Sequence, residues 1–133
     1  MTDRAELVRR QRALAAFGEF VLSHENLSEI LQEACRLVAE ALGAEFAKVV
    51  EIEAGKDTGL VRAGIGWKPG TVGHARVELG ERTSEAHALN SGAPVITRDI
   101  ANERRFVFPE FMRDHGIVAI VNVPIFLPGR RPY

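Results

Sequence analysis

The segment Gly64-Ile65-Gly66-Trp67-Lys68-Pro69 is the part of this sequence that begins most like a cofactor-binding motif. A dinucleotide fingerprint needs a third glycine for close packing of the following helix, and Pro69 stands in its place. The loop ending in Gly-Lys-Ser/Thr that holds nucleotide phosphates is missing as well. These glycines are therefore interpreted as turn residues.

Metal and redox chemistry has few candidate side chains. The histidines do not stand at helical metal spacing and are interpreted as surface or capping residues: His24, His74, His87 and His115. The single cysteine, Cys35, excludes an internal disulfide and any multi-cysteine zinc site. It lies at the edge of an apolar helical stripe, which favours a buried, inert thiol. The alternative, a reductase or hydrolase with Cys35 as nucleophile, needs a cationic or helix-start setting. We expect no metal site and no catalytic residue.

Charge patterning excludes two classes of partner. The chain has 17 basic and 18 acidic residues, a net charge of −1, and the basic residues are scattered. The sequence therefore predicts neither a nucleic-acid surface nor attraction to an anionic membrane. One charged cluster precedes Phe106, and it is either a solvated loop or a loop that orders over a ligand; its members are Asp99, Glu103, Arg104 and Arg105.

Length and composition describe one folded domain. The chain has 133 residues, of which 46% are hydrophobic. No apolar run approaches the roughly 20 residues that span a bilayer, and residues 1–6 lack the apolar stretch of a secretory signal. We expect a cytoplasmic protein that is part of something larger.

The N-terminal residues 3–22 are expected to form a helix, set apart as a segment over 1–25. Leu7, Leu14 and Val21 recur at a spacing of seven. One interpretation is an amphipathic helix packed on its own domain. The other is an interface helix that pairs with a second copy.

A second helix and a hairpin follow. Residues 27–42 carry an apolar stripe, with Asn26 able to cap the helix and Gly43 able to end it. Residues 46–53 and 60–67 are expected to be strands, the second with an alternating apolar face, and the turn-rich link between them predicts a hairpin.

In the rest of the chain, glycine and proline residues separate short expected elements. The expected elements are an extended segment over 75–79, a helix between Thr83 and Gly92, a strand over 94–98, and a helix between Pro109 and Gly116. Residues 117–127 are the most apolar segment and predict a buried strand, with Pro124 at a bulge or non-bonding position. Residues 127–133 form a turn with no returning strand, which predicts a domain cut short.

Two motifs then carry a family resemblance, Gly92-Ala93-Pro94-Val95-Ile96-Thr97-Arg98-Asp99-Ile100 and His115-Gly116-Ile117-Val118-Ala119-Ile120-Val121-Asn122-Val123-Pro124-Ile125. With the helix ending at Gly43 and the strand from Phe46, residues 26–133 resemble a GAF domain, most closely those of bacterial sensor histidine kinases. The resemblance implies an α/β (α+β) fold. A central antiparallel sheet would carry the N-terminal helices on one face and a ligand pocket of loops and short helices on the other. The family continues with a further strand and a helix, so this domain is expected to be incomplete at its C-terminus.

Departures from the family exclude some of its cofactors. In plant-type and cyanobacterial phytochromes a Cys-His pair precedes the segment that aligns with His115-Gly116-Ile117, and Val107 and Phe108 stand there. A covalent bilin is therefore not expected. One cysteine cannot run the disulfide cycle of the GAF-type methionine sulfoxide reductases. No residue offers a clear haem ligand, with His74 and His115 the remaining candidates, and the cofactor stays unknown.

Transferred to this chain, the pocket would lie between the sheet face and residues 67–116. The candidate ligand-binding residues are six wall residues, Trp67, Val72, Phe106, Phe108, Phe111 and Asn122, and two polar anchors, Arg98 and Asp99. The alternative is that the same aromatic side chains fill the core.

The resemblance implies a small-molecule sensor, the input domain of a histidine kinase. It would form a homodimer through the N-terminal helix and pass its signal to an output domain. The alternative is a ligand-free structural dimerisation module.

Overall fold

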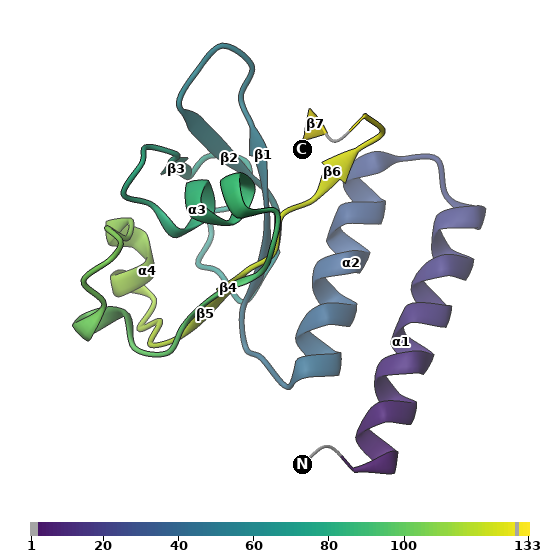
Figure 1. The fold of residues 1–133 in the computed structure, drawn as a ribbon. Coiled ribbons are helices and arrows are strands. Elements are labelled where there is room, and N and C mark those ends of the chain that lie inside the picture. The colour runs from purple at the N-terminus through teal and green to yellow at the C-terminus, as the bar shows by residue number, and fades with distance from the viewer. Residues whose placement is uncertain (1–2, 130) are drawn as a thin grey trace. The chain divides into compact units, whose positions relative to one another are not determined.

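The computed structural model describes residues 3–129 and 131–133. The chain divides into two compact units. The first comprises Met1–Val49 and Val61–Gly73, and the second comprises Val50–Leu60 and His74–Tyr133. Strands β1 (Ala47–Ile52) and β2 (Thr58–Ile65) have residues in both units (Figure 1).

Two helices dominate the first unit, α1 (Arg4–Ser23) and α2 (Leu27–Leu42), which lie side by side (Figure 1). The predicted capping is confirmed for α2. The Asn26 side chain accepts a hydrogen bond from Glu29 N at 3.1 Å, and Gly43 ends the helix with φ of +65°. Both helices fall within a residue of their predicted bounds, because cap residues decide where a helix can start and stop.

The two faces of α1 have different surroundings. Its half-buried residues, among them Ala13, Phe17 and Phe20, recur at helical spacing on one face, and α1 packs against α2. Leu7, Leu14 and Val21 are 49%, 73% and 38% exposed. The predicted spacing therefore produces an open apolar seam on α1.

The end of the β1–β2 hairpin in the first unit is held by side chains. Gln32 of α2 donates from Nε2 to Gly64 O at 2.7 Å and accepts from Gly64 N at 3.2 Å. Trp67 Nε1 donates to Ala47 O at 2.8 Å. Gly66 follows β2 with φ of +89°, and a Cβ there would lie 2.3 Å from the carbonyl oxygen of Glu45. The Glu45 backbone therefore lies too close for any side chain at position 66, which explains why this residue, interpreted from the sequence as a turn residue, is glycine.

The second unit contains the short elements. They are β3 (Arg76–Glu78), α3 (Ser84–Ser91), β4 (Val95–Thr97), η1 (Ile100–Asn102), α4 (Glu110–Asp114), β5 (Ile120–Asn122), β6 (Phe126–Leu127) and β7 (Arg131–Pro132). The strands form a three-stranded sheet in the order β1-β2-β3 and two two-stranded ribbons, β4–β5 and β6–β7. The pairs β2–β3, β4–β5 and β6–β7 are antiparallel, as the expected mixed fold of helices and antiparallel sheet requires.

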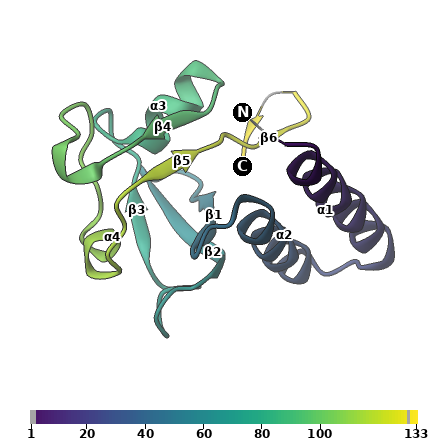
Figure 2. The ribbon, with the colours of Figure 1, turned by 90° about the horizontal axis from the view of Figure 1, so that it is seen from below.

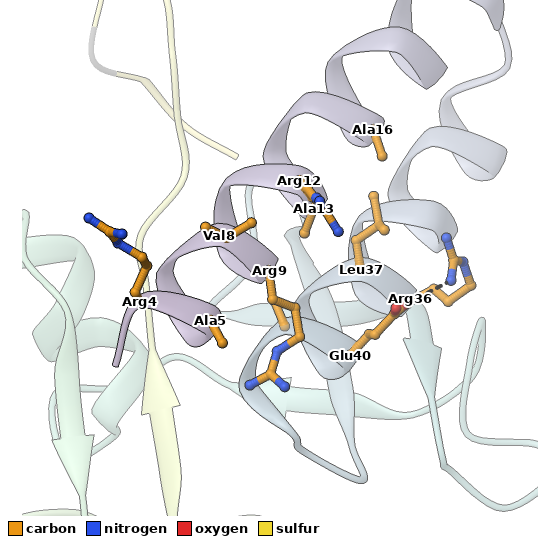
Figure 3. Close-up of a pocket in the computed structure, with 11 residues that line it drawn as sticks. Arg4, Ala5, Val8, Arg9, Arg12, Ala13, Ala16, Arg36, Leu37 and Glu40 are labelled. Carbon is orange, nitrogen blue, oxygen red and sulfur yellow. Dashed lines mark hydrogen bonds and ion pairs between the residues drawn. The ribbon is translucent and has the colours of Figure 1, made fainter. Parts of the chain in front are cut away.

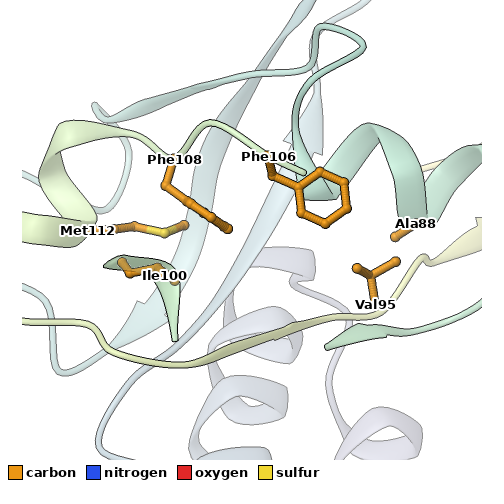
Figure 4. Close-up of a cluster of buried hydrophobic side chains, with 6 residues drawn as sticks. All are labelled: Ala88, Val95, Ile100, Phe106, Phe108 and Met112. Carbon is orange, nitrogen blue, oxygen red and sulfur yellow. The ribbon is translucent and has the colours of Figure 1, made fainter. Parts of the chain in front are cut away.

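Aromatic and aliphatic side chains from these short elements form a buried cluster (Figure 4). We call it the apolar cluster, and its members are Ala88, Val95, Ile100, Phe106, Phe108 and Met112. Phe106 points toward Ala88 and Val95, whereas Phe108 lies beside Ile100 and Met112 (Figure 4). The cluster anchors the otherwise irregular segment between β4 and α4.

The prediction of one buried strand over residues 117–127 is wrong. Only Ile120–Asn122 and Phe126–Leu127 are strands, and Pro124 lies between them, where it interrupts no ladder. Exposure alternates along the segment, with Val121, Val123 and Ile125 at 46%, 61% and 50%. A continuous apolar run suggested burial on both faces, but only one face of this segment is covered.

The expectation of a turn without a returning strand is also corrected. The two residues of β7 pair with β6, Phe126 opposite Pro132 and Leu127 opposite Arg131. Ile52 N donates a hydrogen bond to Tyr133 O at 2.7 Å. The Tyr133 hydroxyl donates one to Glu51 Oε2 at 3.0 Å. Arg130 lies outside the described residues.

Candidate functional site

Three of the predicted wall residues belong to the packing of the second unit. Phe106 and Phe108 are 8% and 3% exposed and stand edge to face, with ring centroids 6.4 Å apart. Phe111 is half-buried and packs against the apolar cluster. The structure therefore brings the phenylalanines together as core side chains, which is the alternative that the sequence left open.

The predicted polar anchors Arg98 and Asp99 lie at the surface beside η1. Asp99 accepts from Ala101 N at 3.1 Å and from Asn102 Nδ2 at 2.7 Å, so its carboxylate caps the short helix. Both anchors line a shallow pocket of about 500 Å³. In the same pocket Arg105 pairs with Glu103 at 2.9 Å, and these hydrogen bonds lower the pKa of the Glu103 carboxyl to about 2.

Trp67 and Val72 belong to the first unit. The half-buried Trp67 ring packs on Phe46 at a centroid distance of 4.9 Å, and its nitrogen holds the β1 backbone as described above. Val72 is 38% exposed. Within the first unit, Trp67 therefore packs at the end of the β1–β2 hairpin and binds its backbone.

The predicted candidate Asn122 is half-buried and contacts a group of buried polar side chains. Asn122 Nδ2 donates to Ser84 Oγ at 2.7 Å. Ser84 Oγ in turn lies 3.4 Å from Glu85 Oε2, in geometry for a hydrogen bond. Together with Thr97, these residues form what we call the polar cluster: Ser84, Glu85, Thr97 and Asn122. All four belong to the second unit.

Two local structures position the polar cluster. Thr83 caps α3 by accepting from Ala86 N at 3.2 Å, which fixes Ser84 and Glu85 in the first helical turn. In the β4–β5 ribbon Val95 is opposite Asn122 and Thr97 is opposite Ile120. Directly opposite residues of an antiparallel pair share a face, so Thr97 and Asn122 are diagonal neighbours on one face, about 7–8 Å apart. Helix α3 packs against both strands of this ribbon (Figure 2).

Two oxygen atoms of the polar cluster are buried and have no hydrogen-bond partner, Glu85 Oε1 and Thr97 Oγ1. Ser84, Thr97 and Glu85 are only 0%, 1% and 8% exposed. A buried polar atom without a partner costs roughly 1–3 kcal/mol, and more when the group is charged. Such atoms in a folded protein require an explanation, and a bound water, ion or small molecule that donates to them is one.

A small molecule that supplies hydrogen-bond donors would satisfy these atoms. A carboxylate oxygen accepts hydrogen bonds, and a threonine hydroxyl can accept or donate. The apolar cluster adjoins this polar cluster, because Val95 is opposite Asn122 and Ala88 lies one turn after Ser84 on α3. Small-molecule sites combine apolar surface with a few placed polar groups, although the polar cluster lines neither of the two pockets described in this section.

Sequence reasoning found only Asn122 of these four residues. Thr97 carried a usable signal, because it alternates with Val95 in a predicted strand and so shares the inward face. Ser84 and Glu85 carried none, since polar residues in the first turn of a short helix are ordinarily solvated.

A larger pocket lies on the first unit, in the groove between α1 and α2 (Figure 3). Its volume is about 930 Å³. Alanine, valine and leucine side chains line it together with charged ones, the charged residues being Arg4, Arg9, Arg12, Arg36 and Glu40. Arg36 is neutralised by ion pairs with Glu33 and Glu40. None of the residues predicted to bind a ligand lines this groove.

Cys35 is buried in α2, as the sequence predicts, and is 3% exposed. Burial raises the pKa of its thiol to about 11, although a hydrogen bond with the Val49 backbone and the charge of Lys48 act in the opposite direction. The fold therefore favours the protonated, unreactive form.

We expect the Cys35 thiol in the folded protein to react with a disulfide reagent at pH 8 on the order of a hundredfold more slowly than in the urea-unfolded chain. The unfolded thiol titrates near pH 9, so the stabilisation by this group is complete below that pH. It is lost as the pH rises toward 11. Thiol labelling at pH 8 and urea titrations at pH 8 and 10 measure both effects. Equal labelling rates in the two states would contradict the burial.

Two absences hold for the described part of the chain. No group of three or more His, Cys, Asp and Glu side chains there could hold a metal ion. No helix there is long and apolar enough to cross a membrane.

Comparisons with known proteins place this geometry in context. A family model described as GAF domain matches residues 26–132. No curated protein sequence matches the chain. Among solved structures, the GAF domain of a phosphoenolpyruvate-protein phosphotransferase from Coxiella burnetii is 17% identical with a TM-score of 0.78, over 94% of this chain and 74% of that one.

Two further solved structures are similar. Free methionine-R-sulfoxide reductase from Neisseria meningitidis, in complex with its substrate, is 17% identical with a TM-score of 0.75, over 99% of this chain and 73% of that one. The phycocyanobilin-bound GAF domain of a cyanobacterial phytochrome is 16% identical with a TM-score of 0.69, over 92% and 75%. At these identities the likeness shows a shared fold.

Proposed function

Because this chain belongs to the GAF domain family, whose model matches residues 26–132, we propose that it is a sensory module that binds a small molecule. GAF domains are sensory or regulatory ligand-binding modules. In our proposal the module is not itself an enzyme and works in the cytoplasm as the input domain of a histidine kinase. The resemblance of the segments Gly92–Ile100 and His115–Ile125 to kinase GAF domains supports this context.

The polar cluster carries the proposal. Glu85 Oε1 and Thr97 Oγ1 are enclosed in the protein without partners, beside an apolar wall. A bound molecule that donates to these oxygens removes their desolvation penalty. It therefore binds the folded second unit better than the unfolded chain and stabilises it.

Replacing Thr97 by valine, which keeps the shape and removes the hydroxyl, tests the site. We expect ligand affinity to fall roughly tenfold, because one hydrogen bond of about 1–1.5 kcal/mol is lost. The free energy of unfolding of the ligand-free protein should stay unchanged or rise by about 1 kcal/mol. Native mass spectrometry detects a bound mass that denaturation releases, and urea titration gives the stability.

Ile96→Val is the matched control, since Ile96 is the neighbouring residue on the opposite face of β4 and is 61% exposed. It should change neither quantity. A ligand that binds the wild-type protein and T97V equally well would show that Thr97 does not contact it.

The second candidate function is a ligand-free structural dimerisation module, with homodimerisation through α1. The exposed seam of Leu7, Leu14 and Val21 favours self-association through this helix, because such a stripe is buried when a second helix packs on it. In either case the dimer would pass a signal to a downstream output domain. With balanced charge, the module would contact neither nucleic acid nor membrane. A dimer peak in native mass spectra, with no bound mass, would favour this second function.

A further inference from the structure

We propose that the molecule recognised by the polar cluster is a small organic cation, with an apolar body and a protonated nitrogen such as an ammonium, amidinium or guanidinium group. This inference rests on the proposed function, because it names the ligand class of the same site. It goes further by assigning the charge of the ligand from the charge and hydrogen bonds of the protein.

The first step concerns the charge of the site. Glu85 contributes a carboxylate that is 8% exposed, and one of its oxygens has no partner. Among the residues that the structure describes, no Lys, Arg or His nitrogen lies within 4.0 Å of this carboxylate. Glu85 lies in the first turn of α3, where the helix N-terminus favours its negative charge, but no side-chain cation of the described residues pairs with it, so a positively charged ligand is preferred to an anion.

The second step concerns which lone pairs are free. Asn122 donates to Ser84, and Ser84 is in turn placed to donate to Glu85 Oε2. This chain of hydrogen bonds satisfies one carboxylate oxygen and leaves Oε1 as the acceptor. Thr97 Oγ1 supplies a second acceptor on the adjoining ribbon face. A protonated nitrogen carries two or more N–H donors and can use such acceptors, whereas a single hydroxyl donor serves one.

The third step concerns the body of the ligand. The residues next to the polar cluster are Ala88, Val95 and Phe106, which are buried and apolar. A bare metal ion would gain nothing from this wall, and the described residues offer no set of three metal-ligating side chains. An anion would meet the charge of Glu85. A neutral donor would form a hydrogen bond with Glu85 but no ion pair.

Glu85→Gln tests the inference, because it removes the charge and preserves nearly the same shape. The probes are two pools of bacterial small-molecule extract below about 1 kDa, one retained on a cation-exchange resin and one passing through it. Native mass spectrometry records the mass bound by wild-type protein from each pool. We expect a bound mass from the retained pool, and at least a tenfold lower bound fraction for E85Q.

Glu81→Gln is the matched control, an exposed carboxylate four residues earlier that should bind the same mass as the wild type. Urea titration of each variant checks folding. Should E85Q not fold, Glu85→Asp replaces it, because it keeps the charge but withdraws it by one methylene. E85D should then bind the cation more weakly than the wild type and still take nothing from the other pool.

Two results overturn the inference, and they differ in what they say of the proposed function. A bound mass from the flow-through pool, or one that E85Q retains, leaves a small-molecule sensor and removes the cation. If neither pool gives a bound mass, both the assignment of a cationic ligand and the proposed function are wrong.

Discussion

Replacing Phe108 by alanine is expected to lower the free energy of unfolding by about 3–5 kcal/mol. Phe108 is 3% exposed and packs with Phe106, Ile100 and Met112 in the apolar cluster, so the substitution removes a ring and leaves a cavity. Urea denaturation followed by circular dichroism measures the change. The result decides whether this residue, predicted as a pocket wall, is instead part of the core.

Val107→Ala provides the matched control at the adjacent position. Val107 is 52% exposed, so its truncation should change the free energy of unfolding by no more than about 0.5 kcal/mol. If F108A were as mild as V107A and mainly altered ligand binding, Phe108 would line a site and the core assignment would fail.

Gly66→Ala is expected to destabilise the protein by about 2–5 kcal/mol. The positive φ of +89° accounts for roughly 1–2 kcal/mol of this cost in any residue with a Cβ. The remaining 1–3 kcal/mol, roughly, comes from the clash of the new methyl group with the Glu45 carbonyl oxygen, 2.3 Å away. Thermal and urea unfolding of the purified variant measure the total.

Gly70→Ala separates the two contributions. Gly70 has the same φ of +89°, and a Cβ there meets nothing within 4 Å. It should cost only the roughly 1–2 kcal/mol of backbone strain. Equal destabilisation by G66A and G70A would show that the backbone of Glu45 moves aside without penalty.

Local signals in the sequence predicted the helices well. Asn26 and Gly43 set the ends of α2, and Thr83 and Gly92 set those of α3, because capping depends on residues adjacent in the chain. The pattern of the family resemblance likewise predicted the mixed fold of helices and antiparallel sheet.

Long-range packing was not predictable in the same way. The apolar run over 117–127 gave no sign that only one of its faces would be covered, since that depends on which elements pack there. The aromatic residues before α4 could equally have been a pocket wall or a core. For Glu85 the difficulty was greater, because its burial comes from the docking of α3 on the β4–β5 ribbon and not from its own neighbours.

The enclosure of Glu85 Oε1 and Thr97 Oγ1 has a consequence for how fast the protein responds. Atoms with no exposed surface cannot be reached until part of the second unit opens, so a ligand of the proposed site would wait for a minor open state. At high ligand concentration the observed association rate should then level off at the rate of opening. The apparent affinity is reduced by the fraction of time that the site is open. A sensor of this kind would respond to the ligand concentration averaged over its opening time, and only weakly to shorter pulses.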